Sequence, residues 1–264
     1  MPKLSIITVN LNNAEGLRKT IESVVYQTFN DYEFIVVDGG STDGSVDVIQ
    51  QYANKITWWV SEPDKGIYHA MNKGILQAKG EYCQFLNSGD WIIDHHGLQL
   101  VFDKNPDEDI CYCDVQNGKK KYVFADRLNL LTFFEGSISH QASFFKRSLF
   151  TTYGLYNEEN KIVSDWEFYI KTIIISQCSY LHIPVLLIYC DVNGISWNSG
   201  NREILEGERT KVIKEYFPEM YEIYQQFRSL YNKNRHYHNS RLIQLIVKLQ
   251  SSALYRRIRK IKNS

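Results

Sequence analysis

Short apolar segments alternate with helical patterns over residues 1–90, and this alternation restricts the possible fold more than any other feature of the chain. Between the first two segments, for example, Leu17 and Ile21 repeat at helical spacing. Strands separated by helices of this length pair in parallel through right-handed crossovers. We therefore predict an α/β fold with a Rossmann-like, mostly parallel central sheet flanked by helices. The apolar segments are Leu4–Val9, Phe34–Val37, Ile56–Val60 and Tyr82–Leu86.

Each of these predicted strands ends in polar residues. Asn10 ends the first strand and Asp38 the second, while Glu62-Pro63-Asp64 and Asn87-Ser88-Gly89-Asp90 follow the third and fourth. In an open α/β sheet, ligands bind beyond the carboxyl ends of the parallel strands. The sequence therefore predicts one binding site built from all four strand ends.

The acidic residues Asp38, Asp64 and Asp90 indicate what this site binds. Lys65 is the nearest basic residue, so a diphosphate alone would be repelled by the carboxylates. A divalent cation, Mn²⁺ or Mg²⁺, can bridge carboxylates and phosphates. The sequence has no G-x-G-x-x-G after the first strand and no G-x-x-x-x-G-K-[ST], which argues against a dehydrogenase and a P-loop NTPase. We therefore expect a metal-bridged nucleotide.

Several short motifs, in their order along the chain, resemble those of glycosyltransferase family 2 over about residues 3–195. They are Ser5–Asn10, Gln27-Thr28-Phe29, Val36–Ser45, Ser61–Tyr68, Ala70–Gly74, Gly80-Glu81-Tyr82, Asn87–Asp90, His140-Gln141 and Ser164–Phe168. The chain looks most like members that assemble bacterial surface polysaccharides such as capsule, exopolysaccharide or O-antigen. The resemblance implies a GT-A fold and an inverting mechanism. The donor would be a nucleoside-diphosphate sugar, for which we expect a UDP-sugar, and the acceptor a hydroxyl of a saccharide or lipid-linked saccharide.

The resemblance also assigns roles to the residues at the strand ends. Asp90 would bind the metal or the sugar-phosphate. Asn87 stands at the position of the first acidic residue of the family's metal motif, and Gly89 precedes Asp90, so one carboxylate of that motif remains. The expected nucleotide-sugar contacts are Val9, Asn10, Asp38, Asp64, Lys65, Asn72, Asn87 and Asp90.

Asp165 is the candidate general base, because it lies in a segment that resembles the family's base motif. It precedes an apolar helical pattern, so the alternative is a carboxylate that caps a helix. On the acceptor or phosphate side we place Trp91, His140 and Trp166. The alternatives are core packing for the two tryptophans and a structural histidine bonded to a loop.

Two competing functions remain. A nucleotidyltransferase that makes the sugar nucleotide would share the α/β domain, but it should carry a Gly-rich phosphate loop, and Asn10–Ala14 contains no Gly. A catalytically degenerate saccharide-binding or scaffold protein would be consistent with Asn87 in the metal motif.

We predict a catalytic domain over residues 1–200, with a nucleotide-sugar half at about 1–92 and an acceptor half at about 93–200, followed by a helical region over 201–264. Residues 233–264 contain nine Lys or Arg and no acidic residue, so the rest of the chain holds 30 − 9 = 21 basic against 30 acidic residues, a net charge of −9. The basic amphipathic pattern at 241–261 suits an anionic membrane surface, with packing on its own domain or a dimer contact as alternatives. The acidic body argues against nucleic acid as a partner.

The sequence also bears on location. Its five cysteines form no C-x-x-C pair, no signal peptide opens the chain, and no segment reaches the roughly 20 apolar residues that span a bilayer. We expect a cytoplasmic protein that its basic tail could hold peripherally on the inner face of the plasma membrane.

Overall fold

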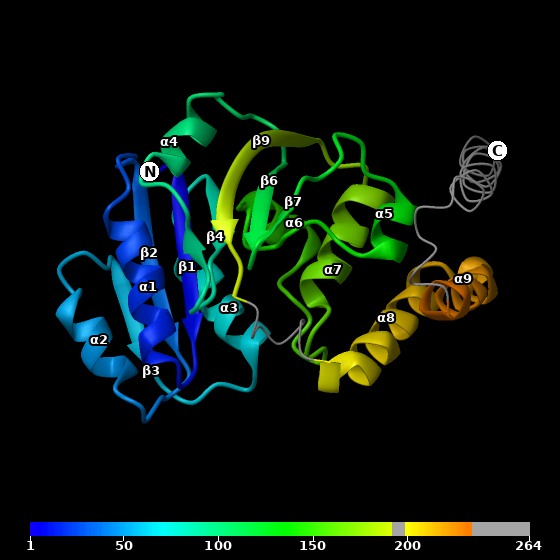
Figure 1. Cartoon of the computed structure of the whole chain (residues 1–264), viewed down its shortest axis with the longest axis horizontal. Coiled ribbons are helices and arrows are strands. Elements are labelled where there is room, and N and C mark those ends of the chain that lie inside the picture. The colour runs from blue at the N-terminus through cyan, green and yellow to red at the C-terminus, as the bar shows by residue number, and fades with distance from the viewer. Residues whose placement is uncertain (192–198, 234–264) are drawn as a thin grey trace. The chain divides into compact units, whose positions relative to one another are not determined.

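The computed structural model describes residues 1–191 and 199–233 (Figure 1). By contact density the chain separates into two units. The first unit comprises residues 1–128 and 138–209. The second comprises residues 129–137 and the chain from Thr210 onward, of which the structure describes residues 210–233. All candidate site residues except those of the C-terminal tail lie in the first unit.

The first unit is built on one sheet with the strand order β3-β2-β1-β4-β8-β6-β9-β5, and β7 pairs with β6 outside this path. β1, β2, β3 and β4 pair in parallel, as the strand–helix alternation predicts. The parallel set ends at β8, which runs antiparallel to β4 and to β6. The strands are β1 (Leu4–Asn10), β2 (Tyr32–Asp38), β3 (Trp58–Ser61), β4 (Tyr82–Phe85), β5 (Trp91–Ile92), β6 (Ile110–Asn117), β7 (Lys120–Tyr122), β8 (Ser143–Lys146) and β9 (Tyr180–Tyr189).

Helices connect these strands and cover the sheet, so the predicted α/β class is confirmed. The π-helix η1 (Ile170–Ile175) continues α7, over the apolar pattern that follows Asp165. The α-helices are α1 (Ala14–Val25), α2 (Ser45–Gln51), α3 (Ile67–Gln77), α4 (Gly97–Phe102), α5 (Leu130–Glu135), α6 (Ser148–Tyr153), α7 (Ser164–Tyr169), α8 (Arg202–Tyr216) and α9 (Tyr221–Lys233). Short 3₁₀ turns, η2 (Ser199–Asn201) and η3 (Pro218–Met220), precede α8 and α9.

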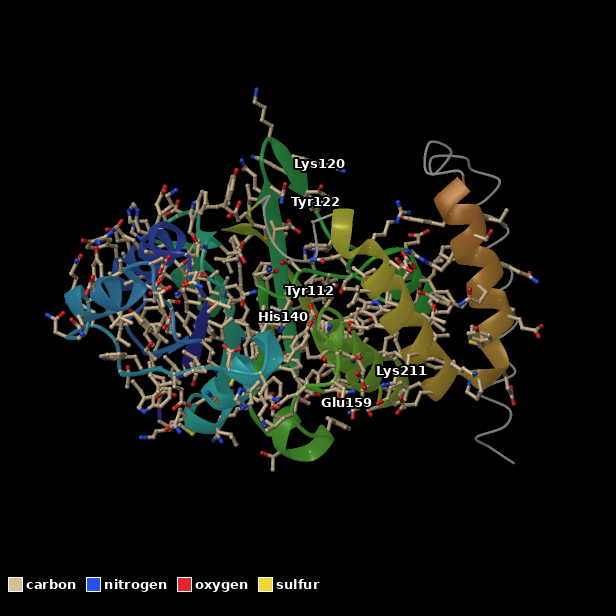
Figure 2. All side chains as sticks on the ribbon, turned by 90° about the horizontal axis from the view of Figure 1, so that it is seen from below. Tyr112, Lys120, Tyr122, His140, Glu159 and Lys211 are labelled. Atoms are coloured by element: carbon tan, nitrogen blue, oxygen red, sulfur yellow. The ribbon has the colours of Figure 1, made fainter. Side chains whose placement is uncertain are left out.

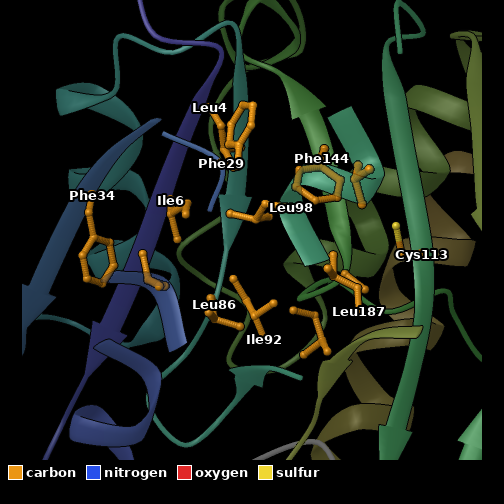
Figure 3. Packing of buried hydrophobic residues seen from close by; sticks show 14 of the residues in the cluster. Leu4, Ile6, Phe29, Phe34, Leu86, Ile92, Leu98, Cys113, Phe144 and Leu187 are labelled. Carbon is orange, nitrogen blue, oxygen red and sulfur yellow. The ribbon is translucent and has the colours of Figure 1, made fainter. Parts of the chain in front are cut away.

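Alternating side chains of β1 serve the two faces of the sheet. Leu4 and Ile6 (Figure 3) are fully buried. The cluster to which they belong also contains Leu17 and Ile21 of α1. Ile7 points to the opposite face, which α3 covers. Burial on both faces fixes the register of β1, because a slip by one residue would exchange the two sets of side chains.

Register places the strand ends together. Asn10 pairs with Asp38 across β1 and β2, and Asp38 pairs with Ser61 across β2 and β3. The polar residues that end these three strands therefore lie side by side at one edge of the sheet, as predicted for parallel strands.

The first turns of α8 pack on the first unit. Both carboxylate oxygens of Glu208 accept backbone N–H bonds, from Lys161 at 2.7 Å and Ile162 at 3.0 Å. The Arg209 guanidinium lies 4.9 Å from the centre of the Trp166 ring. These contacts hold the loop that leads into α7 in place. They therefore also help to fix the position of Asp165 at the start of that helix.

In the second unit, α5 and α9 pack through the edge-to-face rings of Phe134 and Tyr224, and Arg228 donates a hydrogen bond to the Phe134 carbonyl. The predicted basic pattern at 241–261 lies outside the described residues. Within residues 1–191 and 199–233, no helix is both long enough and apolar enough to cross a membrane.

Candidate active site

Asp38 is the most completely bonded carboxylate at the strand ends. It is 0% exposed, and one oxygen accepts from Asn10 Nδ2 at 2.7 Å and Ser41 Oγ at 2.6 Å. The other oxygen accepts from Ser61 Oγ at 2.6 Å and from the backbone N–H groups of Gly40 and Ser41. Burial alone would raise the pKa of Asp38, but these donors outweigh burial and lower the pKa. Asp38 is therefore ionised at neutral pH and organises the loop that follows β2.

The side-chain amide of Asn10 donates to Asp38 through Nδ2 and also carries an acceptor oxygen, Oδ1. The Asn10 side chain is 4% exposed, and its Oδ1 has no hydrogen-bond partner in the described structure. A buried carbonyl oxygen without a donor is costly, so this atom is available to accept a hydrogen bond from a bound group. Val9, the residue before it, is 5% exposed, and its carbonyl accepts from Ser88 N.

The loop after β3 lies against the loop after β2. Asp64 accepts a bond from the Gly66 N–H through Oδ1, and a Cβ at Gly39 would lie 2.5 Å from its Oδ2. Only glycine at position 39 allows this approach. Lys65, at the tip of the same loop, is exposed. Asp64 thus lies against the loop that follows Asp38, and Lys65 is exposed to solvent on the same loop as Asp64.

Asp90 forms an acidic pair with a residue that the sequence pattern did not single out. Its Oδ1 accepts a 2.8 Å bond from the backbone N–H of Asp191, which follows the end of β9. A Cβ at Gly89 (φ +100°) would lie 3.1 Å from Asp191 Oδ2. Burial raises the pKa of Asp90 to about 7, and the charge of Asp191 adds to this increase. The contact at Gly89 and the backbone bond place Asp191 against the Asp90 loop.

These residues are suited to hold a divalent cation. Asn87 Oδ1 is buried and has no hydrogen-bond partner in the described structure. Asn87, Asp90 and Asp191 thus offer oxygen ligands from the ends of β4 and β9, which is the chemistry that Mg²⁺ and Mn²⁺ prefer. No group of three or more His, Cys, Asp or Glu side chains within the described residues could hold a metal by itself. Such a site therefore needs phosphate oxygens of the nucleotide to complete the coordination.

Asp165 lies near the start of α7 and is partly exposed. The cap residue of this helix is Val163, and no side chain caps the helix there. The Asp165 carboxylate instead accepts a 2.8 Å bond from the Tyr68 hydroxyl of α3. The carboxylate is thus held from one side and partly open to solvent, which is compatible with the expected role of a general base.

His140 lies in the interior of the first unit (Figure 2), where it is 5% exposed. Its Nε2 is 2.8 Å from the Tyr156 hydroxyl, and its ring stacks on Phe85. Burial lowers the pKa of His140, and the charge of Asp165 opposes this only in part. A neutral, buried and bonded ring fits the structural alternative for His140, because its Nε2 is engaged by Tyr156.

The two candidate tryptophans differ. Trp91 is partly exposed, and one face of its ring stacks on Tyr189 at 4.0 Å. Trp166 is 2% exposed and lies under the Arg209 guanidinium, so it has no ring face open to a sugar in this conformation. Core packing is the alternative that fits Trp166, whereas Trp91 stays a candidate.

Asn72 ties α3 to the loop that contains Tyr156. Its Nδ2 donates to the Tyr156 carbonyl and to Glu158 Oε1, both at 2.9 Å, and its Oδ1 accepts from the Tyr156 N–H at 3.0 Å. The side chain is 4% exposed. This bonding describes a structural amide, in contrast to the donor contact expected from the sequence.

Replacing Asn72 by Ala should lower the free energy of unfolding by about 2–4 kcal/mol, because the main chain of Tyr156 loses both partners in a buried place. Urea unfolding with an unchanged m-value would measure this loss. Asn30→Ala is the matched control, since Asn30 is exposed and its side chain donates to the Thr28 carbonyl at a turn. Equal losses in the two variants would contradict the structural role.

Tyr68 and Asp191 are the candidate functional residues that sequence reasoning missed. Tyr68 is bonded to a residue 97 positions away, and Asp191 to one 101 positions away. Asp191 lies just after the end of β9, a strand-end position like those of Asp38 and Asp90. Tyr68 lies in the motif Ser61–Tyr68, but it stands in the first turn of α3, where no strand end marks it as a site residue.

Comparison with known proteins identifies the family of this chain. The family model described as Glycosyl transferase family 2 matches residues 5–162. A PGL/p-HBAD biosynthesis glycosyltransferase of Mycobacterium tuberculosis is 31% identical over 216 residues, which cover 78% of this chain and 83% of that protein. A cholesterol galactosyltransferase of Borreliella burgdorferi is 30% identical over 61% of this chain and 45% of its own.

Solved structures share the fold. S. aureus TarS 1-349 in complex with UDP superposes with a TM-score of 0.62 at 19% identity, over 83% of this chain and 72% of that one. The mannosyltransferase PcManGT from Pyrobaculum calidifontis, in complex with GDP-Man and Mn²⁺, gives a TM-score of 0.63 at 17% identity, over 85% and 68% of the two chains. The predicted GT-A fold is confirmed by these neighbours. With a family match over more than half of its length, this chain belongs to glycosyltransferase family 2 and is a glycosyltransferase.

Proposed function

We propose that this enzyme transfers a sugar with inversion from a UDP-sugar to a hydroxyl of a saccharide or lipid-linked saccharide in the synthesis of a bacterial surface glycan. The observation that carries the proposal is the buried Asp90 carboxyl beside Asp191 and the unpartnered oxygen of Asn87, at the edge of the sheet where the Asp38 loop also lies. Neighbours in complex with UDP, UDP-GlcNAc and GDP-Man support a nucleotide-sugar donor. A relative named a cholesterol galactosyltransferase supports a lipid-borne acceptor.

In this proposal the nucleotide lies over the loops that follow β1, β2 and β3. Asn10 Oδ1 is a buried acceptor without a hydrogen-bond donor in the described structure. An N–H or hydroxyl group of the nucleoside would donate to it. Asp38 holds the loop rather than the ligand, because five donors already occupy its two oxygens. The exposed Lys65 can approach the diphosphate from the Asp64 loop.

Asp90, Asp191 and Asn87 would hold the divalent cation, to which they would offer two carboxylates and a neutral oxygen beside the donor phosphates. A bound cation would supply Lewis-acid stabilisation of the negative charge that develops on the leaving diphosphate. Asp191 thereby takes the place of the acidic residue that the metal motif lacks at Asn87.

Asp165 would act as the base of the inverting transfer. Its carboxylate takes the proton of the acceptor hydroxyl while that oxygen bonds to the anomeric carbon and the bond from this carbon to the diphosphate breaks. Alignment of the two substrates supplies much of the acceleration.

We also propose that residues 1–200 form the catalytic domain and that the helical region 201–264 serves acceptor delivery or membrane attachment.

The donor assignment can be tested by calorimetry of UDP, GDP, CDP and dTDP binding, each with and without Mn²⁺. We expect UDP to bind, and its affinity to rise by at least about tenfold with Mn²⁺, as for a cation that bridges protein and phosphate. If GDP, CDP or dTDP binds more tightly than UDP, the donor is instead a sugar linked to that nucleotide. Absence of binding by every nucleotide would contradict the proposed function and favour a degenerate saccharide-binding protein.

A further inference from the structure

The contact between Tyr68 and Asp165 joins two distant parts of the first unit. Tyr68 is the second residue of α3, on the nucleotide side, and Asp165 is the second residue of α7. The Tyr68 hydroxyl donates to Asp165 Oδ1 at 2.8 Å. Among the described residues this is the one side-chain hydrogen bond that the Asp165 carboxylate accepts, so Oδ2 has no protein donor there.

The Tyr68 side chain is held firmly in place. It is 5% exposed, and its ring centre lies 5.7 Å from that of Tyr156. One turn later on α3, Asn72 binds the main chain of Tyr156 through both atoms of its amide. Burial raises the pKa of Tyr68 well above its ordinary value, and the charge of Asp165 adds to this increase. The hydroxyl therefore stays a donor over the whole working pH range.

The helix that carries Tyr68 begins directly after the Asp64 loop. Gly66 precedes α3, and its N–H donates to Asp64 Oδ1 at 2.9 Å. The distance along the chain from Lys65 to Tyr68 is three residues. The Asp64 loop therefore leads directly into the helical turn that carries Tyr68, the partner of Asp165.

We propose that Tyr68 is a positioning residue for sugar transfer, whose hydroxyl holds Oδ1 of Asp165 so that Oδ2 is aimed at the acceptor hydroxyl. The inference rests on the proposed role of Asp165 as the base. A base oriented by a third group is the arrangement found wherever a side chain must take a proton in a defined direction. Without Tyr68, the carboxylate would rotate about its terminal torsion, which is broad and has no deep minimum.

Tyr68→Phe tests the proposal, because it removes the hydroxyl and keeps the buried ring. We expect kcat to fall by between about 10- and 10²-fold, the cost of a misaligned reacting group. The donor Kd and the acceptor KM should each change by less than about twofold, since neither substrate loses a contact. Rates are normalised to the number of binding-competent sites from the calorimetric stoichiometry, so that unfolded protein does not count.

Tyr82→Phe is the matched control. Tyr82 is also a buried tyrosine of the first unit, and its hydroxyl donates to the Glu108 carbonyl at 2.8 Å. Its loss removes a comparable hydrogen bond at a place that does not contact Asp165. We expect similar losses of unfolding free energy in the two variants and an unchanged kcat in Tyr82→Phe.

A double-mutant cycle with Asp165→Asn separates positioning from packing. If Tyr68 acts through Asp165, Tyr68→Phe should change the residual kcat of Asp165→Asn by less than about twofold. An equal fall of kcat in both backgrounds, or a wild-type kcat in Tyr68→Phe alone, would overturn the positioning role. A near-normal kcat in Asp165→Asn would instead overturn the proposed base, so the two failures are distinguishable.

Discussion

Asp165→Asn is expected to lower kcat by about 10²- to 10⁴-fold, the range found when a general base is removed. The amide has the shape of the carboxylate, and its oxygen can still accept the hydrogen bond from Tyr68. It cannot take the proton of the acceptor hydroxyl at neutral pH. The variant therefore removes the chemistry and leaves the packing of α7 in place.

The rate should be measured as release of nucleoside diphosphate at saturating donor and acceptor. The donor Kd, measured by calorimetry, should stay within about twofold of the wild-type value, because Asp165 is placed on the acceptor side. Asp47→Asn serves as the control, since Asp47 is an exposed carboxylate on α2. A near-wild-type kcat together with intact donor affinity would remove Asp165 from the role of base.

Asp90→Asn is expected to weaken Mn²⁺-dependent binding of the nucleotide by at least about 10²-fold, because a coordinating carboxylate contributes more than the 10- to 100-fold typical of residues that only support ligands. Asp191→Asn should weaken the same binding by about tenfold or more, if its carboxylate is the second ligand. Asp103→Asn, an exposed carboxylate at the end of α4, is the control. Unchanged Mn²⁺ affinity in Asp191→Asn would leave Asp90 as the sole acidic ligand.

The same site should show a defined pH dependence. Because burial raises the pKa of Asp90 to about 7, the carboxyl is protonated below that pH and must lose its proton before it can bind a cation. The apparent affinity for Mn²⁺ should therefore fall by about tenfold per pH unit below pH 7 and level off above it. Calorimetry at pH 6, 7 and 8 in Asp90→Asn and wild type would test this, since the slope should disappear in the variant.

Much of the site followed from the ends of the strands. The alternation of apolar runs and helical patterns placed Asn10, Asp38 and Asp64 at one edge of the sheet, and the parallel registers confirm that placement for Asn10, Asp38 and Ser61. The position of Asp165 at the start of a helix could also be predicted, because the apolar helical pattern directly follows it in the sequence. The roles of individual side chains were harder to predict, since Asp38, Asn72 and His140 proved to be engaged by the protein itself.

In the region after residue 200, the helices follow from the sequence but their contacts do not. α8 and α9 lie in the region 201–264 that the sequence predicts to be helical, and η3 begins between them at Pro218. The Glu208 bonds to the loop before α7 could not be predicted, because they join α8 to a segment with no periodic pattern of its own. The predicted membrane contact of the basic segment stays a proposal.

The sequence by itself determined the α/β class, the parallel pairing among β1 to β4 and the polar edge of the sheet. Hydrophobic periodicity and strand-end chemistry are local properties, so they can be read directly from one chain. Only the tertiary structure decided which side chain meets which. Asp191 reaches Asp90 across 101 residues and Tyr68 reaches Asp165 across 97. Trp166 and His140 turn inward for the same reason, since burial depends on how the antiparallel strand β8, α7 and the first turns of α8 close around them. Contacts of this kind arise from packing of distant segments, and no local pattern in the chain encodes them.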